Sequence, residues 1–190
     1  MKLNMGCGMN KQRGYVNVDL SPACAPDVLW DLEVTPWPWP DDSAIEIVFR
    51  HSLEHMGQSP RVFLAMMKEL YRISRNGARI LIAVPHPRHD FYLSDPTHVR
   101  PITPQTLSHF DHSLNQEWIR IGAANTPLAI YIGVDFVIRN VTTELAEPYR
   151  TRVANNRLSE TKLQSLLKSR CNVASEYRIE LVARKLSKSG

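Results

Sequence analysis

The pattern of hydrophobic and polar positions along the chain predicts strands that alternate with helices. Segments with the short apolar or alternating character of strands cover residues 2–5, 15–20, 27–32, 44–49, 78–85, 134–143 and 177–185. Helical spacing is clearest after Ser59, and it recurs at residues 103–110 and 156–170. Alternation of this kind favours an α/β fold with a mostly parallel, doubly wound sheet.

The clearest helix begins at Ser59 and Pro60, which are typical of the N-cap and the first helical position. Its apolar stripe consists of Val62, Met66, Leu70 and Ile73, and Asn76-Gly77 is expected to stop it. The segment 78–85 that follows is almost continuously apolar. Such a strand is typical of the centre of a parallel sheet, buried on both faces.

Two connections differ from the usual α/β pattern. Only residues 9–14 separate the first two strands, which is too few for a crossover helix, so the first helix is expected to be missing or reduced to a turn. Residues 85–104 form a long polar stretch rich in histidine, proline and aspartate. A connection of that length and composition indicates a functional loop.

The size and composition of the chain place it among soluble globular proteins. Its 190 residues, 43% of them hydrophobic, are enough for one core, so a single domain over residues 1–190 is expected. The longest apolar runs, such as residues 80–84, are far too short to insert into a membrane. Because a motif-bearing strand follows Met1 almost at once, no secretory signal is expected and the location predicted is the cytoplasm. Three cysteines without CxxC spacing indicate reduced thiols.

Positive charge is concentrated near the carboxyl end. Residues 150–190 contain ten Lys and Arg against three acids, within a net charge of +4 for the chain. The basic residues are interleaved with leucines at helical spacing, which favours a solvated helix face. A phosphorylated substrate, a nucleic acid or an anionic surface is the alternative partner for this segment.

A glycine pair and an acidic residue point to a ligand at the edge of the predicted sheet. Gly6 and Gly8 follow the first strand, where glycine lets the backbone approach a ligand closely. Asp19 ends the second strand, where a carboxylate can accept both hydroxyls of a ribose. Together they predict an adenosine-type ligand. The third glycine of a dinucleotide fingerprint is missing, which argues against a nicotinamide-dependent oxidoreductase.

An ordered set of segments within residues 1–110 carries a family resemblance: LNMGCG, GYVNVDL, DVLWDLE, PWPWPDDSAIEIVFRHSLEHM and FLAMMKELYRISRNGARILIAVP. The set resembles the class I S-adenosylmethionine-dependent methyltransferases, which have a Rossmann-like fold. In particular it resembles compact bacterial members with a shortened first helix, whose genes often lie near those of surface-polysaccharide enzymes.

The resemblance implies a role for each matching residue in binding S-adenosylmethionine. Asn4, Gly6 and Gly8 would line the methionine moiety, and His51 would pack near its end. Asp19 would hold the ribose, while Asp31 and Leu32 would meet the adenine. The family commonly has an acid where this chain has Asn4, so a weaker or water-mediated contact to the ammonium group is expected there.

Histidines are concentrated after the fourth and fifth predicted strands, and they suit proton transfer near neutral pH. They are His51, His55, His86, His89 and His98. His98 is the first candidate for a general base, since Asp95, three residues earlier, can orient an imidazole. His55 is a second catalytic candidate, and Arg100 is expected to clamp an acidic or phosphorylated acceptor.

Two further features leave alternatives open. His51, Glu54, His55 and His98 are the types of residue that bind a divalent metal, but Glu54 and His55 can equally cap or brace a helix. Trp37 and Trp39, in a proline-rich loop, can either stack on a ligand ring or plug the edge of the sheet.

The function expected is therefore methyl transfer from S-adenosylmethionine to a small molecule, with a hydroxyl of a sugar or glycan precursor as the leading acceptor and an amino sugar as a close variant. Nucleic acid is the less favoured acceptor, because an Asn/Asp-Pro-Pro-Tyr/Phe motif and an added recognition domain are missing from the sequence. A non-catalytic protein that binds S-adenosylmethionine or a nucleotide is the alternative from another class. Apolar residues around 126–137 make a homo-oligomer interface one interpretation of that region, and ordinary core the other.

Overall fold

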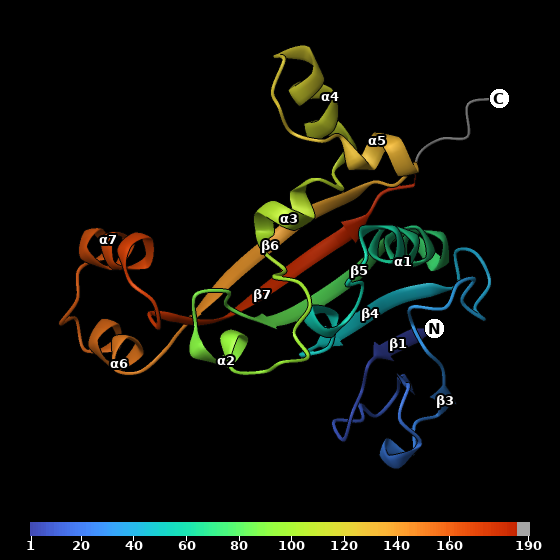
Figure 1. The fold of residues 1–190 in the computed structure, drawn as a ribbon, viewed down its shortest axis with the longest axis horizontal. Coiled ribbons are helices and arrows are strands. Elements are labelled where there is room, and N and C mark those ends of the chain that lie inside the picture. Colours follow the sequence, from blue (N-terminus) through green and yellow to red (C-terminus); the bar gives the residue numbers. More distant parts are fainter. Residues whose placement is uncertain (186–190) are drawn as a thin grey trace.

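Seven strands form one sheet in the computed structural model, which describes residues 1–185 (Figure 1). The strands are β1 (Lys2–Met5), β2 (Val16–Asp19), β3 (Val28–Leu29), β4 (Ala44–Arg50), β5 (Ser74–Pro85), β6 (Phe136–Leu145) and β7 (Ala174–Ala183). Their order is β3-β2-β1-β4-β5-β7-β6. β7 is antiparallel to β5 and β6, whereas the pairs among β1 to β5 are parallel. The chain reverses its direction of progress between β1 and β4, so the expected Rossmann-like, mostly parallel fold is confirmed.

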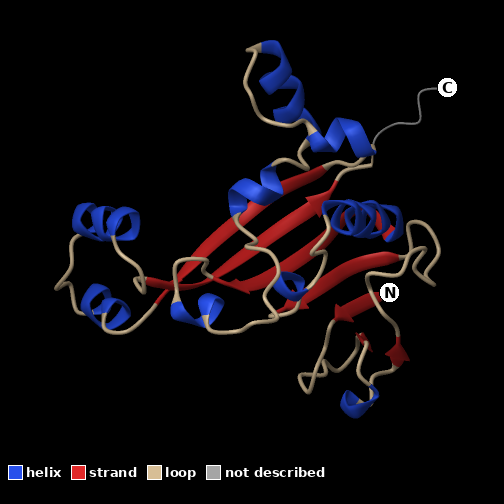
Figure 2. Cartoon of the chain, in the orientation of Figure 1, coloured by secondary structure: helices blue, strands red, loops and turns tan. Residues whose placement is uncertain are grey.

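Short helices fill the connections between the strands (Figure 2). They are η1 (Pro22–Cys24), η2 (Leu53–His55), α1 (Pro60–Ile73), α2 (Asp90–Leu93), α3 (Pro104–Ser108), α4 (His112–Arg120), α5 (Leu128–Ile132), α6 (Tyr149–Ala154) and α7 (Glu160–Ser169). β1 and β2 are joined without a helix, as the short connection predicts. The pattern of residues did not reveal α4, α5 or α6, because short helices carry little periodic signal.

The helix α1 starts where the sequence predicts and ends earlier. Ser59 is its N-cap and Pro60 its first residue, but the backbone is already extended at Ser74. The Ser74 hydroxyl donates a hydrogen bond to the Leu70 carbonyl and so helps satisfy the last turn. Asn76-Gly77 therefore lies within β5 rather than at the helix end, and Gly77 has a φ of 80°.

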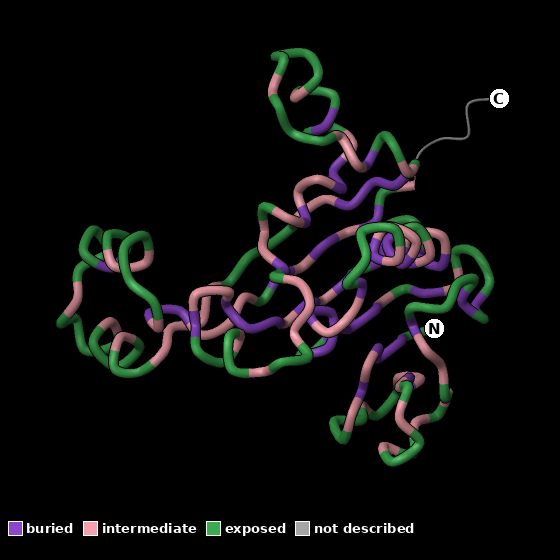
Figure 3. Tube along the Cα trace, in the orientation of Figure 1, coloured by how far each residue is buried: buried purple, intermediate pink, exposed green. Residues whose placement is uncertain are grey.

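One face of the sheet is packed and the other is open. Ile47, Ile80 and Leu181 lie in register on the packed face and are fully buried, in one core with apolar side chains of α1 and α3. Helices lie over this face of the sheet in Figure 2, and buried segments run along its strands in Figure 3. On the opposite face Arg79 pairs with Glu46 at 3.1 Å and with Glu180 at 2.8 Å. The expectation that residues 78–85 are buried on both faces is therefore wrong. The loop between β1 and β2 and the short η1 replace the helices that would cover the second face.

Trp37 and Trp39 belong to the core. Trp37 is 3% exposed and Trp39 is 7% exposed, and their ring centroids lie 6.1 Å apart in an edge-to-face arrangement. The Trp37 Nε1 donates to the Leu32 carbonyl at 2.9 Å. Both side chains are packed in the hydrophobic core, so the ligand-stacking interpretation is wrong for this pair.

The basic segment lies mainly in an extension between β6 and β7 that contains α6 and α7, at the left of Figure 1. Its basic side chains are exposed, as a solvated helix face requires: Arg150, Arg152, Arg157, Lys162, Lys168 and Arg170. Residues 186–190 of the predicted basic segment lie outside the described residues. In the described part of the chain, no helix combines the length and the apolar character that crossing a membrane requires.

Apolar residues in the 126–137 region belong mostly to the core. Ala129, Val134 and Phe136 are at most 1% exposed, whereas Tyr131 is 69% exposed. This burial supports the interpretation of the region as ordinary core.

Candidate functional site

A cavity of about 480 Å³ lies at the carboxyl ends of β1, β2 and β4, beside the point where the strand order reverses. Open α/β sheets bind ligands at such a point. Six of the residues expected to bind S-adenosylmethionine line it: Gly6, Gly8, Asp19, Asp31, Leu32 and His51. The structure thus gathers residues from three separate connections around one cavity.

Gly6 sits where the end of β1 meets the end of β4. Its φ is 66°, and a Cβ added there would lie 2.5 Å from the Cβ of Ser52. The Ser52 hydroxyl donates to the Met5 carbonyl at 2.8 Å, which holds the two strand ends together. Only glycine fits this position, because a side chain would meet both backbone strain and a clash.

The Asp19 carboxylate joins the loop after β1 to the loop after β2 at the edge of the cavity. Its Oδ2 accepts from the Gly8 backbone N–H at 2.7 Å, and its Oδ1 accepts from the Ser21 N–H at 2.9 Å. A carboxylate has about four lone-pair directions, so these two bonds leave capacity for hydroxyl donors. The aspartate is therefore held in place by the backbone with acceptor positions to spare.

Asn4 is the expected cofactor residue that does not line the cavity. It is 2% exposed, and its Nδ2 donates to the Asn10 carbonyl at 3.0 Å and to Asn17 Oδ1 at 2.9 Å. Asn17 in turn accepts from the Gln12 N–H. Because the Asn4 side chain points toward this loop, it shapes the connection after β1, and the expected contact with an ammonium group is not supported.

Five residues of the cavity wall were not predicted from the sequence: Leu20, Trp30, Glu33, Ser52 and Met56. Trp30 follows β3 at the same edge as Asp19, and its backbone N–H donates to the Asp19 carbonyl at 3.0 Å. Its Nε1 donates to the Val34 carbonyl. The signal in the sequence that points to Trp30 is an aromatic residue directly after the third strand, at the same edge as Asp19.

A second cavity, of about 380 Å³, shares His51 and His55 with the first. Its other lining residues are Glu54, Pro85, Phe91, Asp95, His98, Ser175 and Glu176. His51 has a φ of 51°, and its Nε2 lies 2.7 Å from Glu176 Oε2. The pKa of His51 is raised, mainly by Glu54 and, despite partial burial, by Glu176. The two cavities are therefore neighbours separated by a histidine wall.

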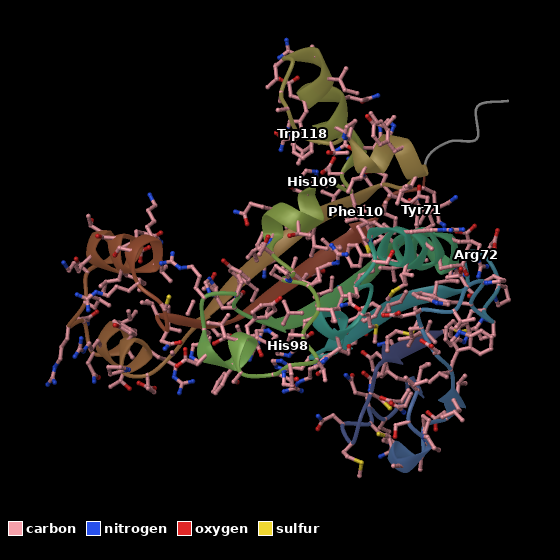
Figure 4. The ribbon with its side chains drawn as sticks, viewed as in Figure 1. Tyr71, Arg72, His98, His109, Phe110 and Trp118 are labelled. Atoms are coloured by element: carbon pink, nitrogen blue, oxygen red, sulfur yellow. The ribbon has the colours of Figure 1, made fainter. Side chains whose placement is uncertain are left out.

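Backbone hydrogen bonds bring His98 to this wall. The Val99 and Arg100 N–H groups donate to the Glu54 carbonyl at 2.9 and 3.3 Å, which ties the long loop to η2. The rings of His55 and His98 have centroids 4.6 Å apart, and Tyr92 stacks on His98 at 5.2 Å. Figure 4 shows His98 on the loop after α2, well away from His109, which packs against Trp118.

The hydrogen bonds of His55 and His98 define which ring nitrogens carry hydrogens. His98 Nδ1 lies 2.7 Å from the Tyr92 carbonyl, which can only accept, so Nδ1 is the donor. The Thr97 hydroxyl donates to Asp95 Oδ1 at 2.6 Å and therefore accepts from His55 Nδ1 at 2.8 Å. When neutral, both imidazoles leave the Nε2 lone pair free. These assignments follow from the partners of each ring.

Asp95 acts differently from the expectation. It lies 3.9 Å from His98 Nε2, on the side opposite to the donor nitrogen, so the Tyr92 carbonyl orients His98. The pKa of Asp95 is lowered, chiefly by the hydroxyl and the backbone N–H of Thr97. Through Thr97, Asp95 supports His55 instead.

Glu54 is buried beside the histidines, and its carboxylate has no hydrogen-bond donor in the part of the chain that the structure describes. Its side chain is 1% exposed, and both carboxylate oxygens lack a hydrogen bond from any described residue. His51 Nδ1 and His98 Nε2 approach Oε1 only to 3.7 and 4.0 Å. A buried carboxylate that accepts no hydrogen bond lowers the stability of the fold, and such groups are rare in folded proteins.

Three other predicted candidates have structural partners and do not line the second cavity. Arg100 donates to the Gly57 carbonyl at 2.6 Å and lies over the Phe63 ring, so the expected acceptor clamp is not supported. His86 Nδ1 accepts from the Arg88 N–H, and burial lowers the pKa of this histidine. His89 Nδ1 accepts from the Phe91 N–H as the cap of α2. The two histidines are thus bonded within their own loop, and Arg100 is bonded to the segment before α1.

The fold is shared with solved methyltransferase structures. The chain is 19% identical to a SAM-dependent methyltransferase from Archaeoglobus fulgidus, with a TM-score of 0.60 over 95% of this chain and 85% of that one. A SAM-dependent methyltransferase from Methanosarcina mazei gives 13% identity and a TM-score of 0.55, over 97% and 92% of the two chains. The [4+2]-cyclase SpnF gives 13% identity and a TM-score of 0.53, over 97% and 75%.

No protein-family model matches the sequence, and no curated protein matches it significantly. At these identities the likeness concerns the fold alone. The fold itself accompanies more than one reaction, as the cyclase shows, so the activity must be argued from the site.

Proposed function

We propose that this chain is an S-adenosylmethionine-dependent methyltransferase, built as a single domain over residues 1–190, that acts on a hydroxyl of a small molecule. The observation that carries the proposal is the common wall of the two cavities. His51 and His55 line both cavities: the first, which Gly6 and Asp19 also line, and the second, where the imidazoles of His55 and His98 lie side by side. A methyl donor in the first cavity would meet an acceptor in the second across this wall.

The first cavity fits S-adenosylmethionine in size and in its polar groups. Gly6 and Gly8 offer backbone without side chains to the methionine part, with His51 at its end. Asp19 has acceptor positions for the ribose hydroxyls. Asp31 and Leu32 would meet the adenine, and Trp30 adds an aromatic wall on the same side. When bound, S-adenosylmethionine supplies a methyl group activated by a sulfonium.

The second cavity supplies what an oxygen acceptor needs. The acceptor oxygen forms a bond to the methyl carbon while the carbon–sulfur bond breaks and its electron pair stays on sulfur. The hydroxyl proton passes to Nε2 of His98, whose Nδ1–H remains on the Tyr92 carbonyl and stabilises the cation that forms. His55, supported by Thr97 and Asp95, lies beside it and helps position the acceptor. Alignment and proton removal are the work of the protein.

A sugar or glycan precursor is the acceptor class we propose first. The resemblance to compact methyltransferases linked to surface polysaccharides supports it, as do the polar lining and small volume of the second cavity, about 380 Å³. The basic residues of α6 and α7 are the observation that would favour nucleic acid instead. A salt-sensitive shift of RNA or DNA by the protein would be the sign of that acceptor.

The test separates cofactor binding from chemistry. Titration calorimetry should show micromolar binding of S-adenosylmethionine and S-adenosylhomocysteine and no binding of NAD. Binding should be lost in Asp19→Ala. It should be kept in the control Asp27→Ala, which replaces an acid whose carboxylate bonds to Asn17. Binding of NAD alone would overturn the proposal. With binding established, transfer of labelled methyl to sugar acceptors should be abolished in His98→Ala. Unchanged turnover in that variant would refute the base, and absence of transfer to any acceptor class would favour a non-catalytic binding protein.

A further inference from the structure

We infer that Glu54, His55 and His98 form a binding site for one divalent transition-metal ion, of the zinc type. One ligand atom from each residue can be chosen so that all lie within 4.8 Å of one another. Nitrogen ligands of zinc lie about 2.0–2.1 Å from the ion, which places two of them roughly 3.4 Å apart in a tetrahedral site. Small side-chain rotations would therefore close the cluster around an ion.

The hydrogen bonds of the two histidines prepare them as ligands. Metal-binding histidines almost always donate the N–H of their second ring nitrogen to a carboxylate, a backbone carbonyl or a water, which fixes the ring and raises its basicity. Here His98 Nδ1 donates to the Tyr92 carbonyl at 2.7 Å. His55 Nδ1 donates to Thr97, which is itself bonded to Asp95. Both Nε2 lone pairs are left for the cavity.

Glu54 supplies the independent sign of a missing cation. Its carboxylate is 1% exposed, and neither oxygen accepts a hydrogen bond from the described residues. A buried charge of this kind is strongly unfavourable unless it is paired or coordinates a metal. His51 fills this role only in part, because its Nδ1 stays 3.7 Å from Glu54, beyond hydrogen-bond distance, while its Nε2 is 2.7 Å from Glu176. An ion bound by the two Nε2 atoms and one Glu54 oxygen satisfies every group at once.

The ligand set decides the class of metal. Two imidazoles and one carboxylate suit zinc and its first-row neighbours, whereas magnesium and calcium prefer sites made of oxygen atoms. Three protein ligands leave a coordination position open, as in catalytic zinc sites. In this chain that position would face a cavity of about 380 Å³.

The role of the ion rests on the proposed methyl transfer, but its binding does not. A hydroxyl of the acceptor would take the open position, and the charge of the ion would lower the pKa of that hydroxyl. With the ion bound, the hydroxyl proton would leave to solvent and Nε2 of His98 would be a ligand. Without the ion, Nε2 of His98 takes the proton as proposed above. Metal binding deepens the proposed function by selecting acceptors that can coordinate through oxygen.

The experiment uses the full chain, stripped with a chelator and free of S-adenosylmethionine. Titration with ZnCl2 should show one site of micromolar or tighter affinity, with much weaker binding of MgCl2. Bound Co2+ should give a visible d–d absorption. His98→Ala and Thr97→Val should each weaken zinc binding at least about tenfold, and His112→Ala, a histidine outside the cluster, should leave it unchanged. Thr97 is exposed, so Thr97→Val tests the site without disturbing the core.

Glu54→Gln distinguishes a ligand from a structural brace. Because the substitution removes a buried charge, metal-free Glu54→Gln should be at least as stable as the metal-free wild type. Zinc should raise the Tm of the wild type but not the Tm of Glu54→Gln. A loss of stability in metal-free Glu54→Gln, equal zinc affinity in all variants, or no zinc binding would each overturn the inference. Cofactor binding that is lost in Asp19→Ala would still stand after such a result, so failure of the metal site and failure of the methyltransferase proposal are separate outcomes.

Discussion

Nε2 of His51 lies 2.7 Å from Oε2 of Glu176, so a residue that follows β4 is joined to β7 across the intervening β5. The pair stands at the wall between the two cavities. It therefore sets how His51 faces both of them, although its two members are more than a hundred residues apart in sequence.

Breaking this pair should weaken cofactor binding without unfolding the protein. We expect Glu176→Gln to raise the Kd for S-adenosylmethionine about two- to fivefold, since a partly exposed pair contributes about 0.5–1 kcal/mol. Glu180→Gln, on the same strand but paired with Arg79, is the control. Equal effects of the two substitutions in calorimetry would show that the His51 contact has no special role.

Gly6 should be the least replaceable glycine of the sheet edge. Gly6→Ala introduces both positive-φ strain and a clash with Ser52, and we expect a loss of about 2–4 kcal/mol in urea unfolding together with loss of cofactor binding. Gly14→Ala carries the strain at a φ of 82° but meets no atom within 4 Å. It should cost about 1 kcal/mol. A similar cost for both would refute the close approach at Ser52.

Substitution of the buried Trp37 should affect mainly stability, whereas substitution of Trp30 in the first cavity should affect mainly cofactor binding. Trp37→Ala removes a buried ring and should cost about 3–5 kcal/mol of unfolding free energy. Trp30→Ala removes a partly exposed ring on the first cavity and should change stability far less while weakening S-adenosylmethionine binding. The reverse pattern in urea unfolding and calorimetry would contradict the assignment of these residues.

Lowering the pH should remove the contribution that the Glu69 carboxylate makes to the free energy of unfolding. The pKa of Glu69 lies below its usual 4.5, chiefly because Arg72 donates to the carboxylate, with a further bond from the Trp37 N–H. A carboxyl with a lower pKa in the folded state stabilises the protein above the pKa of the unfolded state. This stability begins to be lost below about pH 4.5, the pKa of the unfolded state, and is gone once the pH has fallen through the lower folded value.

Glu69→Gln should therefore lower stability at pH 7 and flatten the loss between pH 5 and pH 3, by roughly 1–2 kcal/mol. Urea unfolding across this range measures it. Glu117→Gln, which breaks an exposed pair with Arg120 on α4, should have little effect at any pH. A pH profile of Glu69→Gln parallel to that of the wild type would contradict the assignment.

Features that depend on a few neighbouring residues were predictable. The strands β1 and β4, the start of α1 at Ser59 and the helix-free link after β1 follow from side-chain periodicity, capping and connection length. Gly6 and Asp19 could be placed at one edge because the ends of adjacent parallel strands meet there. This local logic also explains the misplaced end of α1, since Gly77 signals a break but not whether the helix or the next strand contains it.

By itself, then, the sequence determined the order of the strands and the Rossmann-like class, because short-range backbone preferences set both. The family resemblance added to Gly6, Gly8 and Asp19 three more residues that line the first cavity. Only the tertiary structure decided which histidines meet, since the long loop is closed by bonds from Val99 and Arg100 to the Glu54 carbonyl. It also decided that Asn4 turns away and that one face of the sheet stays open. Above all it buried Glu54 without a hydrogen-bond donor among residues 1–185, because burial depends on everything that packs around a residue and not on its neighbours in the chain.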